Sequence, residues 1–132
     1  MSVDTDYVLG THDAEISRLH LQHGIWQTLV HDCWARAGIM PGQHVIDIGC
    51  GPGFASVDLA EVVGPEGRVT GIERSERFIA HAEALSASRG LNNVSFQHAD
   101  VMLDALAVEG ADAIWCRWLA IFVSDPGLLV RK

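Results

Sequence analysis

A short apolar strand that leads directly into closely spaced glycines constrains the fold of this chain more than any other feature. The segment VIDIGCGPGF, residues 45–54, places Gly49, Gly51 and Gly53 at the end of the apolar run. An uninterrupted apolar strand is typical of a parallel sheet covered on both faces, and glycine adopts backbone angles that other residues avoid. Ligands bind at this edge of open parallel sheets. The segment therefore predicts a ligand-binding loop or, taken alone, a plain tight turn.

The rest of the chain alternates strands with helices, which predicts parallel pairing with right-handed crossovers. Strands are expected over 44–48, 68–73, 94–100 and 111–118. Helices are expected from Thr11 or Asp13 to about Ala37, over 54–63, from a cap at Ser75 to about Arg89, and from near Pro126. The pattern predicts one α/β domain over 1–132 with a Rossmann-like parallel sheet and flanking helices, formed by an N-terminal helical segment (1–40) and a core (41–132).

The first expected helix carries both apolar residues and histidines. Its apolar spacing predicts one buried face: Ile16, Leu19, Trp26, Leu29, Val30 and Cys33. Another side carries His20, His23, Gln27 and His31. Histidines at such spacing can bind zinc, but no acidic or cysteine ligand accompanies them in sequence. We therefore predict no metal site, and histidines that are solvated or face a cofactor.

Acidic residues end the next two strands of the predicted sheet. Glu73 closes the segment 68–73, and Asp100 closes the segment 94–100. Carboxyl ends of parallel strands share one edge, so both acids are expected beside the glycine loop. Glu73 follows Gly49 at about the separation at which an acid meets ribose hydroxyls, and Asp100 is placed to accept from an adenine amino group. The alternative for each acid alone is a solvated residue at a strand end.

The glycine spacing argues against a dinucleotide or a nucleoside triphosphate as the ligand. The dinucleotide fingerprint is Gly-x-Gly-x-x-Gly, and its last position here is Phe54. A bulky side chain there opposes the close helix packing that the fingerprint requires. No Gly-Lys-Ser/Thr motif follows the loop. The loop favours a ligand without a pyrophosphate, and a nicotinamide dehydrogenase is the poorer alternative.

Together these residues resemble the class I S-adenosylmethionine-dependent methyltransferases of the small-molecule type. VIDIGCGPG (45–53) is similar to the first motif of that family, GIE (71–73) to its second-strand acid and HAD (98–100) to its third-strand acid. Two further stretches are similar, ADAIWCRWLAIFVSDP (111–126) to the fourth strand and next helix, and YVLGTHDAEISRLHLQ (7–22) to an N-terminal segment of some members. The resemblance implies S-adenosylmethionine as cofactor and methyl transfer to an unidentified small molecule.

The resemblance also implies a set of cofactor-binding residues: Tyr7, Gln22, Asp47, Gly49, Cys50, Gly51, Gly53, Glu73, Arg74, Asp100, Val101, Cys116 and Arg117. The glycine loop would surround the methionine part of the cofactor, supported by Asp47. Glu73 would hold the ribose hydroxyls, and Asp100 with the backbone of Val101 would hold the adenine. Residues 115–118 would lie near the methionine end, and the N-terminal members of the set would close the pocket.

The expected methyl transfer requires mainly that the protein align the acceptor with the methyl group of the cofactor. The sulfonium makes its methyl group an electrophile, so the protein mainly places a nucleophile in line with the methyl–sulfur bond. An acid–base residue is needed only where the nucleophile arrives protonated, and the sequence indicates no catalytic base. Cys50 inside the loop is expected to be a small filler rather than a reactive thiol, because nothing cationic neighbours it in sequence.

The composition of the chain argues against some classes of binding partner. A net charge of −8 argues against direct nucleic-acid binding, which draws on clustered lysine and arginine. No apolar run approaches the ~18 residues of a membrane helix. Three scattered cysteines favour reduced thiols and a cytoplasmic location. We therefore expect no direct nucleic-acid partner and no membrane partner, although an RNA substrate held by a second protein stays open as an alternative. The small-molecule acceptor is what the resemblance implies.

The predicted strands fall short of the resembled fold. Its sheet has seven strands and this sequence supplies material for four, so the chain is interpreted as the N-terminal half of that fold, truncated after the fourth strand. An exposed fourth-strand edge beside the apolar stretch WLAIFV predicts a homodimer through that edge. The alternative function is a catalytically silent adenosyl-binding or self-associating fragment that lacks the substrate half.

Overall fold

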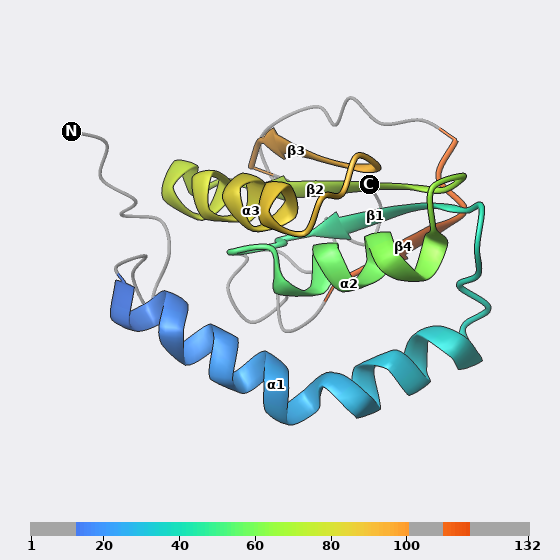
Figure 1. The fold of residues 1–132 in the computed structure, drawn as a ribbon, viewed down its shortest axis with the longest axis horizontal. Coiled ribbons are helices and arrows are strands. Elements are labelled where there is room, and N and C mark those ends of the chain that lie inside the picture. The colour runs from blue at the N-terminus through green and yellow to red at the C-terminus, as the bar shows by residue number, and fades with distance from the viewer. Residues whose placement is uncertain (1–12, 101–109, 117–132) are drawn as a thin grey trace.

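The computed structural model describes residues 13–100 and 110–116 of the 132-residue chain. In chain order its elements are α1 (Asp13–Arg36), β1 (His44–Ile48), α2 (Phe54–Val63), β2 (Arg68–Glu73), α3 (Glu76–Ser88), β3 (Val94–His98) and β4 (Ala113–Trp115). Figure 1 shows α2 and α3 over one face of the sheet, with α1 running outside α2. The predicted α/β alternation is confirmed. The helix expected near Pro126 lies outside the described residues.

In the described part of the chain, four strands form one parallel sheet in the order β3-β2-β1-β4. The chain moves outward from β1 through β2 to β3 and then returns to the other side of β1. The strand order therefore reverses between β1 and β4, the place where open α/β sheets bind ligands. The register pairs Ile48 with Ile72 and Glu73 with His98, so the carboxyl ends of β1, β2 and β3 lie at one edge.

Within the described residues two strands are shorter than the sequence predicts. The third was expected to reach Asp100, but β3 ends at His98 because its partner β2 ends at Glu73. The fourth was expected from residue 111, but β4 begins at Ala113. Just before it, the Asp112 carboxylate accepts a hydrogen bond from the His44 N–H at 2.8 Å. The Asp112 N–H also donates to the His44 carbonyl at 2.8 Å, so Asp112 is joined to β1 by one backbone bond and one side-chain bond ahead of the strand.

The hydrophobic core lies between β1, β2 and the helices that cover them. All five residues of β1 are buried, as the apolar run predicted. Val45 and Val69, paired across β1 and β2, are fully buried, as are Val57 and Val63 of α2. Trp34 of α1 is 1% exposed and meets Trp115 of β4 edge-on, with ring centroids 5.4 Å apart and planes at 84°.

The buried face expected for α1 is partly confirmed, since Val30 is buried and Ile16 and Leu19 are half-buried. The buried residues of α1 are Glu15, His23, Val30 and Trp34, and among the predicted apolar face Trp26, Leu29 and Cys33 are exposed. The helix buries His23 because this side chain reaches the Asp58 carboxylate on α2, which the exposed Gln27 also contacts. Within the described residues, no helix combines the length and apolar character needed to cross a membrane.

Candidate functional site

The glycine loop joins β1 to α2 at the carboxyl edge of the sheet. Gly49, Gly51 and Gly53 have φ angles of 67°, 59° and 97°, in the left-handed region that favours glycine. The loop remains tied to β2, because the N–H groups of Gly49 and Cys50 both donate to the Ile72 carbonyl, at 2.8 and 3.0 Å. The backbone demands glycine here, which explains the residue spacing in the sequence.

Gly51 and Gly53 differ in what surrounds them. A Cβ atom on Gly53 would lie 2.6 Å from the Ala82 Cβ atom of α3, so a side chain there would push α2 and α3 apart. A Cβ atom on Gly51 would meet nothing within 4 Å. Gly53 is therefore required by packing, whereas Gly51 faces open space at the edge where a ligand would sit.

Glu73 fixes the loop from the end of β2. Its carboxylate accepts hydrogen bonds from the N–H groups of Gly51 at 2.9 Å, Arg74 at 3.0 Å and Ser75 at 2.9 Å. Burial raises the pKa of this carboxyl, and the amide hydrogen bonds offset the increase only in part. A carboxylate offers about four acceptor positions, so three amides leave about one for a ligand.

Asp47 and Cys50 lie beside Glu73 in the interior. The Ser56 hydroxyl of α2 donates to the Asp47 carboxylate at 2.6 Å, which links the end of β1 to the helix after the loop. Burial, followed by the charges of Asp47 and Glu73, raises the pKa of the Cys50 thiol well above its ordinary value. A thiol with a raised pKa is a poor nucleophile, which supports a filler role for Cys50.

Aromatic rings from three helices meet at the start of α2. Phe54 stacks on His20 of α1 with centroids 4.6 Å apart, and His81 of α3 approaches its edge at 5.4 Å. The Nδ1 atom of His81 also lies 2.8 Å from the Pro52 carbonyl oxygen in the loop. Sequence reasoning missed these supports of the loop. Phe54 was noted only as a departure from the dinucleotide fingerprint, and nothing local marks His81.

The structure brings the central part of the predicted set together. Asp47, the glycines with Cys50, Glu73 and the backbone of Arg74 form one connected group at the carboxyl edge. Asp100 is half-buried, two residues beyond β3 at the same edge, and Cys116 is exposed directly after β4. Gln22 is half-buried on α1. Three members lie outside the described residues: Tyr7, Val101 and Arg117.

A second polar cluster, the Asp58 cluster, joins α1, α2 and α3 within the protein. Oδ2 of Asp58 lies 2.7 Å from His23 Nε2 and 3.1 Å from His31 Nε2, and it accepts from the Gln27 amide at 2.9 Å. Oδ1 accepts from Arg89 at 3.2 Å. The expectation of a solvated or cofactor-facing side chain is wrong for His23, which is 5% exposed and contacts this carboxylate. Burial alone would raise the pKa of Asp58, but these hydrogen bonds outweigh it and hold the pKa far below its usual range.

The cluster contains an acidic group that the sequence did not place near the histidines. Nevertheless, among residues 13–100 and 110–116 no group of three or more histidine, cysteine or acidic side chains is arranged to hold a metal ion. The prediction that the chain binds no metal stays a prediction. The cluster instead fixes α1 against α2 and α3.

Comparisons with known proteins identify what this arrangement resembles. Residues 39–128 match the protein family described as "Methyltransferase domain". The chain is 37% identical over 71 residues to the demethylmenaquinone methyltransferase of Geobacillus stearothermophilus, covering 54% of this chain and 30% of that protein. It is 39% identical over 80 residues to the 23S rRNA (uracil(1939)-C(5))-methyltransferase RlmD of Acinetobacter baylyi, covering 58% of this chain and 17% of the other.

The fold also matches solved structures. A SAM dependent methyltransferase from Aquifex aeolicus superposes with a TM-score of 0.70 at 25% identity, covering 76% of this chain and 54% of that one. The chain thus spans about half of that structure and less than a third of each of the two curated relatives.

Proposed function

This chain belongs to the methyltransferase domain family, and on that premise we propose that it forms the S-adenosylmethionine-binding part of an enzyme that methylates a small molecule. The observation that carries the proposal is the hydrogen bond from the Gly51 N–H to Glu73 at 2.9 Å. It fastens a glycine loop and a buried carboxylate into one group at the edge where the strand order reverses.

The described residues fit such a cofactor. The open space beside Gly51 lets the backbone approach a ligand closely, as the methionine part of the cofactor requires. Glu73 fastens the loop and keeps about one acceptor position for a ribose hydroxyl. Asp100, beyond β3, is the proposed partner of the adenine amino group, and Cys116, after β4, would lie near the methionine end.

The bound cofactor would supply an electrophilic methyl group on a sulfonium centre. The role of this chain would then be to hold that group rigidly while the acceptor approaches. Rigidity comes from Asp47, whose carboxylate links β1 to Ser56, and from His81, which contacts the Pro52 carbonyl oxygen. The Cys50 thiol, with its raised pKa, takes no part as a nucleophile.

A small-molecule acceptor is favoured by charge and by one of the relatives. The net charge of −8 opposes contact with a phosphate backbone. One relative is named for demethylmenaquinone, whereas the other is named for 23S rRNA and keeps an RNA acceptor as the alternative. Two further expectations stay predictions: the cytoplasmic location and the homodimer through the β4 edge.

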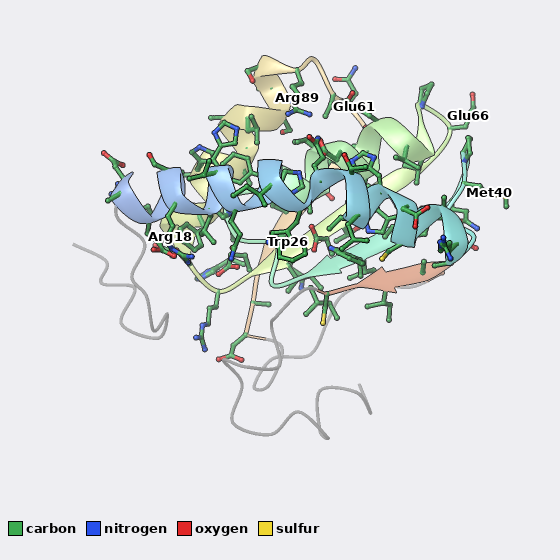
Figure 2. All side chains as sticks on the ribbon, turned by 90° about the horizontal axis from the view of Figure 1, so that it is seen from below. Arg18, Trp26, Met40, Glu61, Glu66 and Arg89 are labelled. Atoms are coloured by element: carbon green, nitrogen blue, oxygen red, sulfur yellow. The ribbon has the colours of Figure 1, made fainter. Side chains whose placement is uncertain are left out.

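Calorimetry with S-adenosylhomocysteine tests the cofactor site. We expect binding by the full chain, and about 10- to 100-fold weaker binding by Glu73→Ala because a charge-assisted acceptor is lost. Glu66→Ala, an exposed acid in the turn before β2 at the opposite edge, is the matched control and should bind like the parent (Figure 2). No binding by the parent chain at millimolar ligand would overturn the proposal.

Transfer of a radiolabelled methyl group tests the acceptor. Incorporation into demethylmenaquinone or another small molecule, with none into ribosomal RNA, is the expected result. Incorporation into RNA alone would overturn the small-molecule assignment. Cofactor binding without transfer to either acceptor would instead favour the catalytically silent alternative.

A further inference from the structure

The outward side of α1 carries an apolar stripe that lies outside the core. Leu21, Ile25 and Leu29 follow one another at a spacing of four residues and are 68%, 69% and 53% exposed. Residues at this spacing share one side of a helix. Figure 2 views the molecule from the α1 side, with this helix nearest the viewer. Exposure of large side chains in a continuous stripe marks an interaction surface.

The sequence around this stripe is symmetric about Ile25. Leu21 and Leu29 each lie four residues from Ile25 in opposite directions. Arg18 and Asp32 each lie seven residues from it, one basic and one acidic. A second copy of α1, antiparallel and centred on the same residue, would therefore place each leucine opposite the other leucine. It would also place each Arg18 opposite an Asp32, at both ends of the contact.

The geometry of α1 is compatible with such a contact. Seven residues of a helix rise about 10.5 Å, two full turns, so residues 18, 25 and 32 lie along one seam. Helices paired through such a seam cross at about 20°, which keeps the ends of the contact within reach of a long arginine side chain. Figure 1 shows α1 bowed with its convex side away from the sheet, which makes the middle of the helix, near Ile25, the first point of contact.

Arg18 and Asp32, at the two ends of the proposed contact, are both charged and partly exposed. Arg18 contacts Glu15 of its own helix and keeps a side chain that is 45% exposed. Asp32 contacts Arg36 at 2.8 Å, and both side chains are more than half exposed. The Asp32–Arg36 pair is exposed and contributes little within one helix, so Asp32 can be shared with a second chain at small cost. Arg18 stays paired with the buried Glu15, and the exposed part of its side chain would face Asp32 of the second chain. Opposite charges would then fix the antiparallel register of the pair.

We propose that α1 is the interface of a homodimer, in which two α1 helices pack antiparallel about Ile25 with Arg18 of each chain facing Asp32 of the other. The inference is independent of the proposed function, because it concerns the outer side of α1 and not the carboxyl edge of the sheet. It differs from the homodimer predicted through the β4 edge, and one experiment distinguishes the two.

Sedimentation of the full chain at several concentrations is the first test. The parent should form a dimer, and Ile25→Glu should weaken dimerisation about tenfold or more because it places two like charges at the centre. Met40→Glu makes the same change at a residue that is 54% exposed but outside the stripe, and it should dimerise like the parent (Figure 2). Since Ile25 is exposed, circular dichroism should report an unchanged fold.

Charge reversal tests the register. Asp32→Arg should weaken the dimer because it places like charges opposite each other at both ends of the contact, and Asp32→Asn should weaken it less. Dimerisation of Asp32→Arg equal to that of the parent would overturn the antiparallel register.

Thiol cross-linking gives a third measurement. In a Cys33→Ser, Cys116→Ser background, Ile25→Cys should form a disulfide-linked dimer on mild oxidation, and Met40→Cys should not. A parent chain that is monomeric at millimolar concentration would overturn the proposal, as would a dimer insensitive to Ile25→Glu, which would favour the β4 edge. Binding of the monomer to phosphatidylglycerol vesicles through Ile25 would overturn it in favour of a lipid surface.

Discussion

Two buried carboxylates, Glu73 at the glycine loop and Asp58 on α2, are held in different ways. Glu73 is 6% exposed and accepts from three backbone N–H groups. Asp58 is 4% exposed and is contacted by the side chains of His23, Gln27, His31 and Arg89. The pKa of Glu73 is raised chiefly by burial, whereas the hydrogen bonds around Asp58 outweigh burial and lower its pKa.

The different partners of Glu73 and Asp58 indicate different roles: Glu73 can contribute to ligand binding, and Asp58 stabilises the fold. At Glu73 neutral amides hold a carboxylate whose charge is only partly compensated, so the group can still gain from a ligand that donates a hydrogen bond. At Asp58 both oxygens are engaged by side chains from α1 and α3, and the charge is matched by Arg89. The Asp58 cluster therefore stabilises the fold, while the loop around Glu73 retains a capacity to bind.

The largest effect is expected at the loop. Gly53→Ala should lower the free energy of unfolding by about 2–5 kcal/mol, because it adds a contact at 2.6 Å to Ala82 and a left-handed φ of 97°. Gly51→Ala is the control, with a positive φ of 59° but open space around the added Cβ atom, and should cost about 1–2 kcal/mol. Urea unfolding measures both, and equal losses would show that packing against α3 does not matter.

Next in size is the Asp58 cluster. Asp58→Asn should lower the free energy of unfolding by about 2–4 kcal/mol at pH 7, because it leaves Arg89 and two histidines without the buried charge. Glu61→Gln removes the other partner of Arg89, on a side chain that is 57% exposed, and should cost less than about 1 kcal/mol. A loss at Glu61 as large as that at Asp58 would contradict the comparison.

Asp58 and Glu73 should also change the free energy of unfolding in opposite directions as the pH rises. Asp58 has a lowered pKa in the folded state, so its contribution is present above its ordinary value of 3.8 and is lost as the pH falls below it. Glu73 has a raised pKa, so the folded state binds its proton more tightly and stability falls as the pH rises above 4.5. Unfolding of Asp58→Asn and Glu73→Gln across pH 2 to 7 measures this. Asp58→Asn should lose the fall in stability below pH 3.8, and Glu73→Gln should lose the fall above pH 4.5.

The smallest effect concerns the cysteine in the loop. Cys33 and Cys116 are exposed and Cys50 is buried with a raised pKa. Titration with a thiol reagent at pH 8 should modify two cysteines rapidly and the third only on unfolding. Rapid modification of Cys50 in the folded protein would show that the loop opens readily.

Sequence predicted the parts of this molecule whose cause is local. The apolar run 44–48, the glycines after it and the strand-end position of Glu73 each follow from backbone geometry within a few residues. The Ser75 cap is also confirmed, since its hydroxyl accepts from the Phe78 N–H at 3.1 Å. These features position the central part of the candidate site.

The remaining features depend on contacts between distant segments. Asp58 lies 35 residues from His23 and 27 from His31 in the sequence, and no local sequence pattern predicts their contact. The contact of Gly53 with Ala82 and the approach of His81 to Phe54 are equally non-local. The buried face of α1 was predicted only in part, because a polar network as well as apolar periodicity decides which side of that helix faces α2.

The perpendicular contact of Trp34 with Trp115 gives the protein a built-in optical reporter. The two indoles belong to α1 and β4, at the outer helix and the strand beside β1. Aromatic rings fixed at 5.4 Å couple their transitions, so the pair should give a near-ultraviolet circular dichroism band that vanishes when α1 separates from the sheet. Detachment of that helix could then be followed while the far-ultraviolet signal of the core persists.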